Sequence, residues 1–462
     1  MTYEESVRAL MALGRELAAP QQARVQKFGL ANIATLAEVL GHPHRASPCV
    51  HIAGTNGKGS TAAIFESIVR LSGFRTGLYT SPHLERINER VRIDGEEVSD
   101  DAFAAAWTRV EAVIESLLAT GKLAAHPTYF ECLTALAFVA FTDARVNFAV
   151  YEVGLGGRLD ATNIVEPEVA ILTSIDFDHE SFLGYSLAEI AAEKAGIIKP
   201  GAWVASSVER PQARDVIRRR CHQVGARLVE VDETWQVELM GTSSGCYRAV
   251  ARSADSEIAL EPSLAGHFQI RNALVAATAA ELVAERGFGV TSKAIEQGIR
   301  SARWPGRLER LQEHPTVYLD GAHNPSGANQ LLSFWKDNLQ GRRILLVYGA
   351  MRDKAVDEIA GLLFPKADVV ILTQPLQPRA ISAPLLAEMT GHLAKSSVII
   401  PDPAEALEHA LGIAARDDVV FATGSLYLVG DLRSYWTKHH RTGGAAQVPT
   451  QTSGPAKTSQ KP

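Results

Sequence analysis

The fold of this chain is decided by one stretch, Val50-His51-Ile52-Ala53-Gly54-Thr55-Asn56-Gly57-Lys58-Gly59-Ser60-Thr61. An apolar, β-branched run ends there in a glycine-rich loop with one lysine, and the helical stretch 62–71 follows. Glycines let a backbone adopt positive φ and approach an anion closely, so that successive N–H groups and the helix N-terminus face a phosphate. Lys58 adds a point charge. The stretch therefore predicts a strand, a phosphate-binding loop and a helix.

This loop departs from the common P-loop spacing G-x-x-x-x-G-K-[ST]. Ile52 stands where the first glycine belongs, and Gly59 separates Lys58 from Ser60. Generic kinases and GTPases therefore fit the sequence poorly. A purely structural turn is the simpler interpretation, but three glycines around a lysine, between a strand and a helix, disfavour it.

The composition describes an ordinary globular protein that is too long for one hydrophobic core. The chain has 462 residues, of which 46% are hydrophobic and 21% charged, which predicts two or three domains. Its 46 lysines and arginines face 52 aspartates and glutamates, so the net charge of −6 provides no basic field for nucleic acid or an anionic membrane. The chain start carries acids instead of an apolar signal core, and no run approaches the roughly 20 apolar residues of a membrane span. Because four scattered cysteines without a CxxC pair suit a reducing compartment, we expect a cytoplasmic protein.

Alternating strand-like and helical stretches predict an α/β fold with a mostly parallel sheet. Strands are expected at 49–53, 76–79, 148–152, 169–173 and 203–206, and helices at 101–119, 129–142, 270–286 and 292–300. Between residues 228 and 260, short polar-interrupted runs with Gly241 and Gly245 as turns predict a small antiparallel insertion. A second series of strands is expected at 316–319, 344–348, 369–373, 398–400 and 419–422. We therefore predict a first domain over 1–301, a second over 302–440 and a disordered tail over 441–462.

Acidic residues stand where two of the expected strands end. Glu152 closes the strand 148–152 just before a glycine turn, and Asp176 and Asp178 follow the strand 169–173. The carboxyl ends of parallel strands form the edge at which α/β proteins bind ligands. A carboxylate buried after an apolar strand needs a compensating cation, and Mg²⁺ is the natural one beside a nucleotide. His179 alone would more often be a hydrogen-bonded loop histidine than a metal ligand.

The loop and five further motifs are similar to those of the folylpolyglutamate synthase / dihydrofolate synthase family, the folate branch of the Mur ligase superfamily. The motifs stand in the family's order, over roughly residues 22–438: Thr80-Ser81-Pro82-His83-Leu84, Gly154-Leu155-Gly156-Gly157, Asp178-His179 with Leu183-Gly184, Glu193-Lys194-Ala195-Gly196-Ile197-Ile198-Lys199, and Asp320-Gly321-Ala322-His323-Asn324-Pro325. Any one of them is weak evidence, but chance agreement of all is negligible. The resemblance implies a P-loop nucleotide-binding domain followed by a Rossmann-like α/β domain.

The resemblance also implies roles for individual residues. The ATP-binding set is Gly57, Lys58, Gly59, Ser60, Asn272, Arg307 and Asp320. The magnesium set is Ser81, Glu152, His179 and Lys194, the last as a carbamylated lysine. The catalytic set is Lys58, Lys194 and His323, and the glutamate-binding set is His323 and Ser425. The pteroate- or folate-binding set is Lys27, Phe28, Gly29, Thr128, Tyr129, Phe130, Glu131, Leu159, Asp160 and Ala161.

Simpler interpretations of three of these assignments stay open. Lys194 read alone would be the solvated end of a helix, and Ser425 would be a helix N-cap. The stretch 129–137 could be an amphipathic core helix rather than part of a pteroate pocket. The acids at the strand ends are firmer candidates than these.

The implied activity is that of an ATP-dependent amide ligase. A carboxylate attacks the γ-phosphate of ATP to give an acyl phosphate, and the amine of L-glutamate then displaces phosphate. A peptidoglycan-type Mur ligase is a distant alternative, a P-loop kinase fits less well, and a regulatory protein with a dead site leaves the filled catalytic positions unexplained. The acceptor can be dihydropteroate, a reduced folate or both; Lys27 stands where some bifunctional relatives carry an acid, which favours a folate that already holds a glutamate. A monomer is the family expectation.

Overall fold

The computed structural model describes residues 1–14 and 29–440, and it contains three β-sheets. The largest is an eight-stranded sheet with the order β4-β3-β2-β5-β1-β6-β7-β8. Its strands are β1 (Cys49–Ala53), β2 (Thr76–Tyr79), β3 (Val91–Ile93), β4 (Glu96–Glu97), β5 (Phe148–Glu152), β6 (Val169–Leu172), β7 (Trp203–Ser206) and β8 (Arg227–Glu230). All neighbours run parallel except the antiparallel pairs β2–β3 and β3–β4 at one edge. The mostly parallel sheet predicted from the sequence is confirmed.

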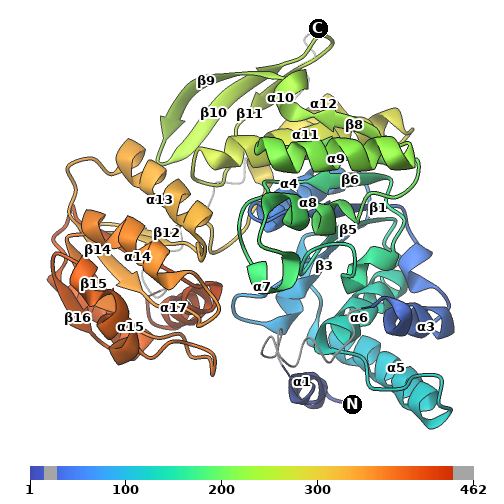
Figure 1. Ribbon diagram of the computed structural model, residues 1–462, viewed down its shortest axis with the longest axis horizontal. Helices are drawn as coiled ribbons and strands as arrows, with labels where there is room; N and C mark the ends of the chain where they lie inside the picture. Colours follow the sequence, from blue (N-terminus) through green and yellow to red (C-terminus); the bar gives the residue numbers. More distant parts are fainter. Residues whose placement is uncertain (15–28, 441–462) are drawn as a thin grey trace, which may run out of the picture.

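Helices cover both faces of this sheet (Figure 1). The helices of this part of the chain, which lie on the sheet or on one another, are α1 (Tyr3–Ala12), α3 (Ala31–Val39), α4 (Lys58–Leu71), α5 (Asp100–Ala119), α6 (Tyr129–Asp143), α7 (Glu180–Leu183), α8 (Leu187–Ala195), α9 (Pro211–Val224), α10 (Val231–Thr234), α11 (Phe268–Glu285) and α12 (Ser292–Ser301). Successive side chains of a strand point to opposite faces. In β5, Phe148 and Val150 therefore join the core with α4 and α11, whereas Ala149 and Tyr151 join the core with α5 and α6. We call this sheet with its helices the first lobe.

The insertion is a three-stranded antiparallel sheet, but it begins later than predicted. Its strands are β9 (Gln236–Ser243), β10 (Cys246–Arg252) and β11 (Glu257–Leu260), in the order β11-β10-β9. Leu228, where the insertion was predicted to begin, lies instead in β8. This strand pairs in parallel with β7 and so belongs to the large sheet. Gly245 forms the β9–β10 turn with a φ of 80°, as predicted. Gly241 is no turn; it lies within β9 opposite Arg248, where the register shifts at a bulge.

The second lobe is a six-stranded sheet with the order β12-β13-β17-β14-β15-β16, together with its helices. The strands are β12 (Glu309–Glu313), β13 (Thr316–Leu319), β14 (Ile344–Tyr348), β15 (Val369–Leu372), β16 (Ser397–Ile399) and β17 (Val419–Thr423). The helices are α13 (Pro325–Asn338), α14 (Val356–Leu363), α15 (Ala383–Thr390), α16 (Pro403–Ile413) and α17 (Leu426–His439). All neighbouring strands are parallel except β12–β13. The lobe lies beside the first one in Figure 1, coloured orange to red.

Short 3₁₀ turns complete the described secondary structure: Pro43–Arg45, Ile87–Arg90, Ala161–Ile164, Phe364–Lys366 and Gly391–Leu393. The predicted domain boundary near residue 302 falls between α12 and β12, and the boundaries themselves stay predictions. The predicted tail 441–462 lies outside the described residues. Within the described ranges, no helix combines the length and the apolar character that crossing a membrane requires.

Candidate active site

The phosphate-binding loop joins β1 to α4, as the sequence predicts. Gly57 precedes the first turn of α4 with a φ of 87°, in the left-handed region that favours glycine. A Cβ at this position would overlap the Asn272 side chain, which α11 presses against the loop. Because the first N–H groups of a helix have no partner within it, the start of α4 offers donors to an anion.

The end of β6 fixes this loop from its far side. Thr55 N donates to Ser174 O at 2.6 Å, and the hydroxyls of Thr173 and Ser174 donate to Asn56 O at 2.8 and 3.1 Å. Lys58 Nζ bonds the carbonyl oxygens of Gly54 and Thr55, each at 3.1 Å. These contacts occupy carbonyl oxygens of the loop, so that its concave side presents N–H groups and a cation.

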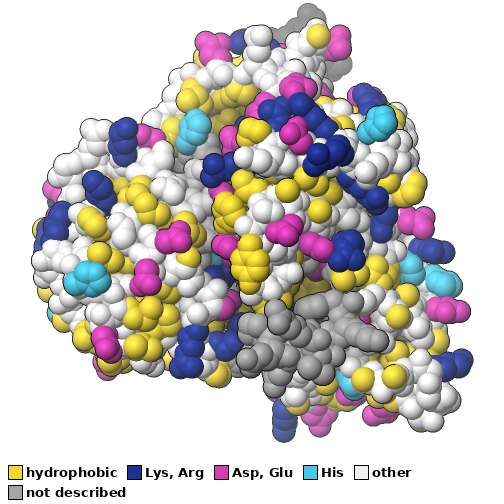
Figure 2. All heavy atoms as spheres, viewed as in Figure 1, with side chains coloured by type: hydrophobic (Ala, Val, Ile, Leu, Met, Phe, Trp, Pro, Cys, Tyr) yellow, Lys and Arg dark blue, Asp and Glu magenta, His cyan; other side chains and the backbone are white. Residues whose placement is uncertain are grey.

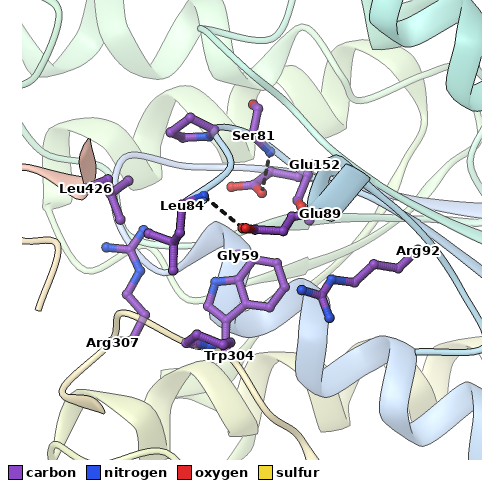
Figure 3. Close-up of a pocket in the computed structure, with 12 residues that line it drawn as sticks. Gly59, Ser81, Leu84, Glu89, Arg92, Glu152, Trp304, Arg307 and Leu426 are labelled. Atoms are coloured by element: carbon purple, nitrogen blue, oxygen red, sulfur yellow. Dashed lines mark hydrogen bonds between the residues drawn. The ribbon is translucent and has the colours of Figure 1, made fainter. Parts of the chain in front are cut away.

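Glu152 ends β5 next to this loop, and only 4% of it is exposed. Ser81 N donates to its Oε2 at 3.3 Å, as Figure 3 shows. Burial raises the pKa of Glu152 to about 7, although Lys58 opposes the rise. Among the ion pairs of the described residues, none involves Glu152. A buried carboxylate with a hydroxyl-bearing neighbour and no direct cation suits a hard divalent ion.

Lys194 lies in the last turn of α8 and is buried, with 5% of it exposed. Its Nζ donates to Gly54 O at 2.8 Å, so the lysine contacts the phosphate-binding loop directly. Burial and the neighbouring Lys58 lower the pKa of Lys194 to about 7. Burial excludes the simpler interpretation of Lys194 as the solvated end of a helix.

His179 and Asp178 lie in the loop after β6, where they meet a residue of the second lobe that sequence reasoning missed. Lys354, between β14 and α14, places its Nζ 2.9 Å from Asp178 Oδ1 and 3.2 Å from His179 Nε2. Burial and Lys354 lower the pKa of His179 to about 4, which keeps the imidazole neutral. A signal for Lys354 was present, because charged residues follow the buried strand β14 at the carboxyl edge of its sheet.

The facing wall of the site comes from the loop after β13. Asp320 is buried, and its two carboxylate oxygens accept the N–H groups of Leu308 and Ala322, each at 2.8 Å. Burial raises the pKa of Asp320, while Arg307 opposes the rise. His323 Nδ1 lies 2.8 Å from Gly321 O, which leaves Nε2 directed toward Asp178, 3.7 Å away.

One cleft between the lobes brings the predicted ATP and metal residues together. It encloses about 2260 Å³, including space open to solvent. Its lining includes Gly57, Lys58, Gly59, Ser60, Ser81, Glu152, His179, Lys194, Asn272, Arg307, Asp320 and His323. In Figure 2 the two lobes stand side by side, with basic and acidic side chains along their boundary. Ser425 is not among the lining residues; it is buried and caps α17 by accepting Tyr427 N at 3.1 Å.

The described residues among those predicted to hold pteroate do not line this cleft. Thr128 and Glu131 form the capping box at the start of α6, and a Cβ at Gly154 would lie 2.5 Å from the Phe130 ring. Asp160 accepts Leu155 N at 2.9 Å and bonds Thr162. The remaining described members are Gly29, which precedes α3, Tyr129 in α6, and Leu159 and Ala161 on either side of Asp160. Lys27 and Phe28 lie outside the described residues.

Across the described part of the chain, no three His, Cys, Asp or Glu side chains gather at one point to hold a metal ion. Of the four predicted magnesium ligands, only Glu152 and His179 are of these residue types. The other two are Ser81 and a modified Lys194. The four residues share the cleft with the phosphate-binding loop, and Glu152 supplies the buried anion that a cation requires. The donor set therefore fits Mg²⁺, while the individual roles stay predictions.

A phosphate-binding loop on one lobe and a facing polar rim on the other define an ATP-dependent ligase of the Mur type. Residues 52–280 match the family model described as the Mur ligase middle domain, and residues 306–426 match the Mur ligase glutamate ligase domain.

The chain belongs to the folylpolyglutamate synthase / dihydrofolate synthase family of these ligases. It is 34% identical over 413 residues to the dihydrofolate synthase/folylpolyglutamate synthase of Bacillus subtilis, covering 88% of this chain and 94% of the relative. It is 35% identical over 405 residues to the folylpolyglutamate synthase of Lacticaseibacillus casei, and this match covers 87% of this chain and 92% of the relative. Its fold is similar to that of a Mycobacterium tuberculosis folylpolyglutamate synthase complexed with ADP and AMPPCP, with a TM-score of 0.83 and 31% identity. The match covers 93% of this chain and 98% of that structure.

Proposed function

We propose that this ligase joins L-glutamate to dihydropteroate, to a reduced folate that already carries glutamate, or to both, through an acyl phosphate. The observation that carries the proposal is one large cleft whose walls come from both lobes. One wall holds the phosphate-binding loop and Glu152, and the other holds Asp320 and His323. The relatives named for these two activities align over most of the chain, which supports the same substrate class here.

Lys58 and Arg307 carry the charge neutralisation that the first step requires. The acceptor carboxylate attacks the γ-phosphorus of ATP, and the bond to the bridging oxygen breaks to leave ADP. Both reactants are anions, so cations preorganised in a cleft lower the barrier by several kcal/mol. Asn272, which hydrogen-bonds Gln269 and abuts Gly57, supports the loop on the nucleotide side.

Ser81, Glu152, His179 and a carbamylated Lys194 would hold magnesium, which when bound adds positive charge beside the transferred phosphoryl group. Carbamylation needs an unprotonated amine, because the nitrogen lone pair attacks CO₂ and one N–H proton is released. Burial of Lys194 favours that neutral form. The product supplies anionic oxygens to the cation in place of an amine.

The rim of the second lobe is proposed to receive L-glutamate. Its amine attacks the acyl carbon, the tetrahedral intermediate expels phosphate, and the amine loses a proton. His323, neutral because burial and Lys354 lower its pKa to about 3, presents an unprotonated ring nitrogen at this wall. Ser425, at the start of α17, is the second proposed glutamate contact, and the lobes together keep water from the acyl phosphate.

The choice of acceptor separates a bifunctional enzyme from a folylpolyglutamate synthase alone. Phe130 of the pteroate set packs beside Gly154, which lines the cleft, so this member of the set borders the site. We propose the bifunctional activity on this ground and on the name of the Bacillus subtilis relative. Lys27 is the residue that would favour a folate acceptor.

The test is ADP formation by the purified protein with ATP, magnesium and L-glutamate, comparing dihydropteroate with tetrahydrofolate in one preparation. A ligase needs acceptor and glutamate together, whereas an ATPase releases phosphate with ATP alone. Product with both acceptors supports the bifunctional proposal. A dihydropteroate rate equal to the blank, with good activity on tetrahydrofolate, removes it and leaves a folylpolyglutamate synthase. Phosphate release independent of both acceptors removes the ligase proposal.

A further inference from the structure

The loop that follows β2 carries Ser81 at one end and reaches into the second lobe with Leu84. Leu84 packs against the second lobe's core, beside Val429 of α17. A Cβ at Gly430 would overlap the Leu84 carbonyl oxygen, and one at Gly306 would lie 2.9 Å from Leu84 Cδ1. Figure 3 shows Leu84 between Glu89, Arg307 and Leu426. The two lobes therefore meet here in a fitted contact.

Arg433 of α17 stabilises the same contact between the lobes by pairing with two carboxylates. Its Nε lies 3.0 Å from both carboxylate oxygens of Glu309, and its Nη1 bonds Glu85 Oε1. The three side chains are partly buried, with 28%, 22% and 19% exposed for Arg433, Glu309 and Glu85. An exposed ion pair contributes little, but one guanidinium shared by two sheltered carboxylates fixes the geometry of both.

Each of these carboxylates belongs to a segment that carries a residue of the proposed site. Glu309 accepts Gly306 N at 2.8 Å, directly beside Arg307. Glu85 lies four residues beyond Ser81, and its own N–H donates to Glu89 at 2.8 Å, as does that of Leu84. Arg433 is therefore linked on one side to the Arg307 segment and on the other to the Ser81 loop.

We propose that Arg433 is a positioning residue that aligns the Ser81 loop of the first lobe with Arg307 when the lobes are together. The proposal rests on the ligase function proposed above. Without the guanidinium, Glu85 and Glu309 face each other as unpaired carboxylates, so that the Ser81 loop and the Arg307 segment repel one another. In the described part of the chain, the contacts that hold the phosphate-binding loop do not involve Arg433: they come from the segment after β6, from α8 and α11, and from Asn324 of the second lobe.

The first experiment compares Arg433→Gln, Arg433→Lys and the control Arg343→Gln, which removes an arginine whose partners Asp418 and Ile413 all lie in the second lobe. Steady-state ligase kinetics and thermal melting are measured on each. We expect kcat to fall at least tenfold in Arg433→Gln with the KM for ATP within threefold of wild type, part of the loss to be regained in Arg433→Lys, and the control to be unchanged. A kcat of Arg433→Gln within twofold of wild type, with or without a lower Tm, overturns the proposal.

The second experiment displaces the loop while Arg433 stays in place. Gly430→Ala adds a methyl group against the Leu84 carbonyl, although alanine is the better helix former. Its matched control is Gly412→Ala in α16, where no atom lies near the added Cβ. We expect kcat to fall at least fivefold in Gly430→Ala alone, with no loss of helical content, and an unchanged kcat overturns the fitted contact. Inactive wild-type protein would count against the proposed function, whereas active wild type with unaffected variants counts against Arg433.

Discussion

Lys354 and Asp178 meet across the cleft, with Nζ of the lysine 2.9 Å from Oδ1 of the aspartate. Both side chains are largely buried, with 9% and 12% exposed, and they come from different lobes. Burial alone raises the pKa of Asp178, but Lys354, His179 and His323 outweigh it and hold the pKa well below its usual range. Asn324 of the second lobe also donates to Asp178, at 3.2 Å. Asp178 is thus the anion of the first lobe that pairs with Lys354 of the second lobe.

Removing that cation should weaken both stability and turnover. Lys354→Met leaves a buried carboxylate without its partner, which costs about 3 kcal/mol in proteins. We expect a lower free energy of unfolding and a kcat/KM at least tenfold below wild type, measured by denaturant unfolding and the ligase assay. Lys395→Met, which breaks an exposed pair with Asp368, is the control. Equal behaviour of the two variants would show that the contact across the cleft contributes nothing specific.

Glu152→Gln should abolish ligase turnover while leaving the fold intact. The amide keeps the size of the side chain but removes the anion that suits magnesium. Losing one preorganised electrostatic group costs roughly 3 kcal/mol, a rate loss of two to three powers of ten. The measurement is kcat at saturating magnesium beside a circular dichroism melt, with the exposed Glu115→Gln as control. Near-normal turnover would reject Glu152 as a metal ligand.

Lys194→Ala should lose activity through the loss of the carbamate. Small carboxylates such as acetate are expected to restore part of the rate, because they can supply anionic oxygens to the space that the side chain vacates. The companion measurement depletes CO₂ from wild-type protein and follows turnover as bicarbonate is returned. Activity that survives both treatments would leave Lys194 as a neutral donor to Gly54 only.

His51 should make the protein less stable in acid. The Thr162 hydroxyl donates to Asp160 at 2.5 Å and so accepts from His51 Nε2, 2.8 Å away, in a fully buried setting. Burial lowers the pKa of His51 to about 3 in the folded state. Below about pH 6.5 the histidine is therefore protonated in the unfolded state but stays neutral in the folded state. Its stability contribution is therefore full above pH 6.5 and is lost as the pH falls toward 3, by roughly 1.4 kcal/mol per pH unit.

The check is the free energy of unfolding of wild type and His51→Gln between pH 7 and pH 4. Glutamine can still donate to Thr162 but does not titrate. We expect the slope of stability against pH to be shallower in the variant by about 1 kcal/mol per unit. Parallel slopes would assign the acid sensitivity to other buried groups.

The strands and the phosphate-binding loop could be predicted because their signals are local. The strand Cys49–Ala53 and the strand Phe148–Glu152 have the predicted bounds, since apolar runs are bounded there by glycines and polar residues. The bounds of β8 were missed because nothing in the run Arg227–Glu230 tells a strand of the large sheet from one of the insertion.

The contacts between the lobes could not be predicted from the chain. The sequence places Lys354 after a buried strand and Arg433 on a helix, but it does not show their partners, which lie 176 and 348 residues away. Which rim residue faces which depends on how two sheets are set against each other, and no periodicity encodes that. The motifs placed Glu152 and Asp320 at their strand ends, but they did not predict the residues that hold the two lobes together.

In the described part of the chain, the lysine and the arginine that form ion pairs between the lobes both belong to the second lobe. Lys354 and Arg433 place their positive charges on the second lobe, and Asp178 and Glu85 place the negative charges on the first. The attraction is confined to these two contacts, which are largely sheltered from solvent, whereas salt at physiological ionic strength screens exposed charges over about 8 Å. Added salt should therefore weaken an exposed pair such as Lys395–Asp368 far more than the contacts that join the lobes, so that the lobes stay together at ionic strengths that dissolve surface ion pairs.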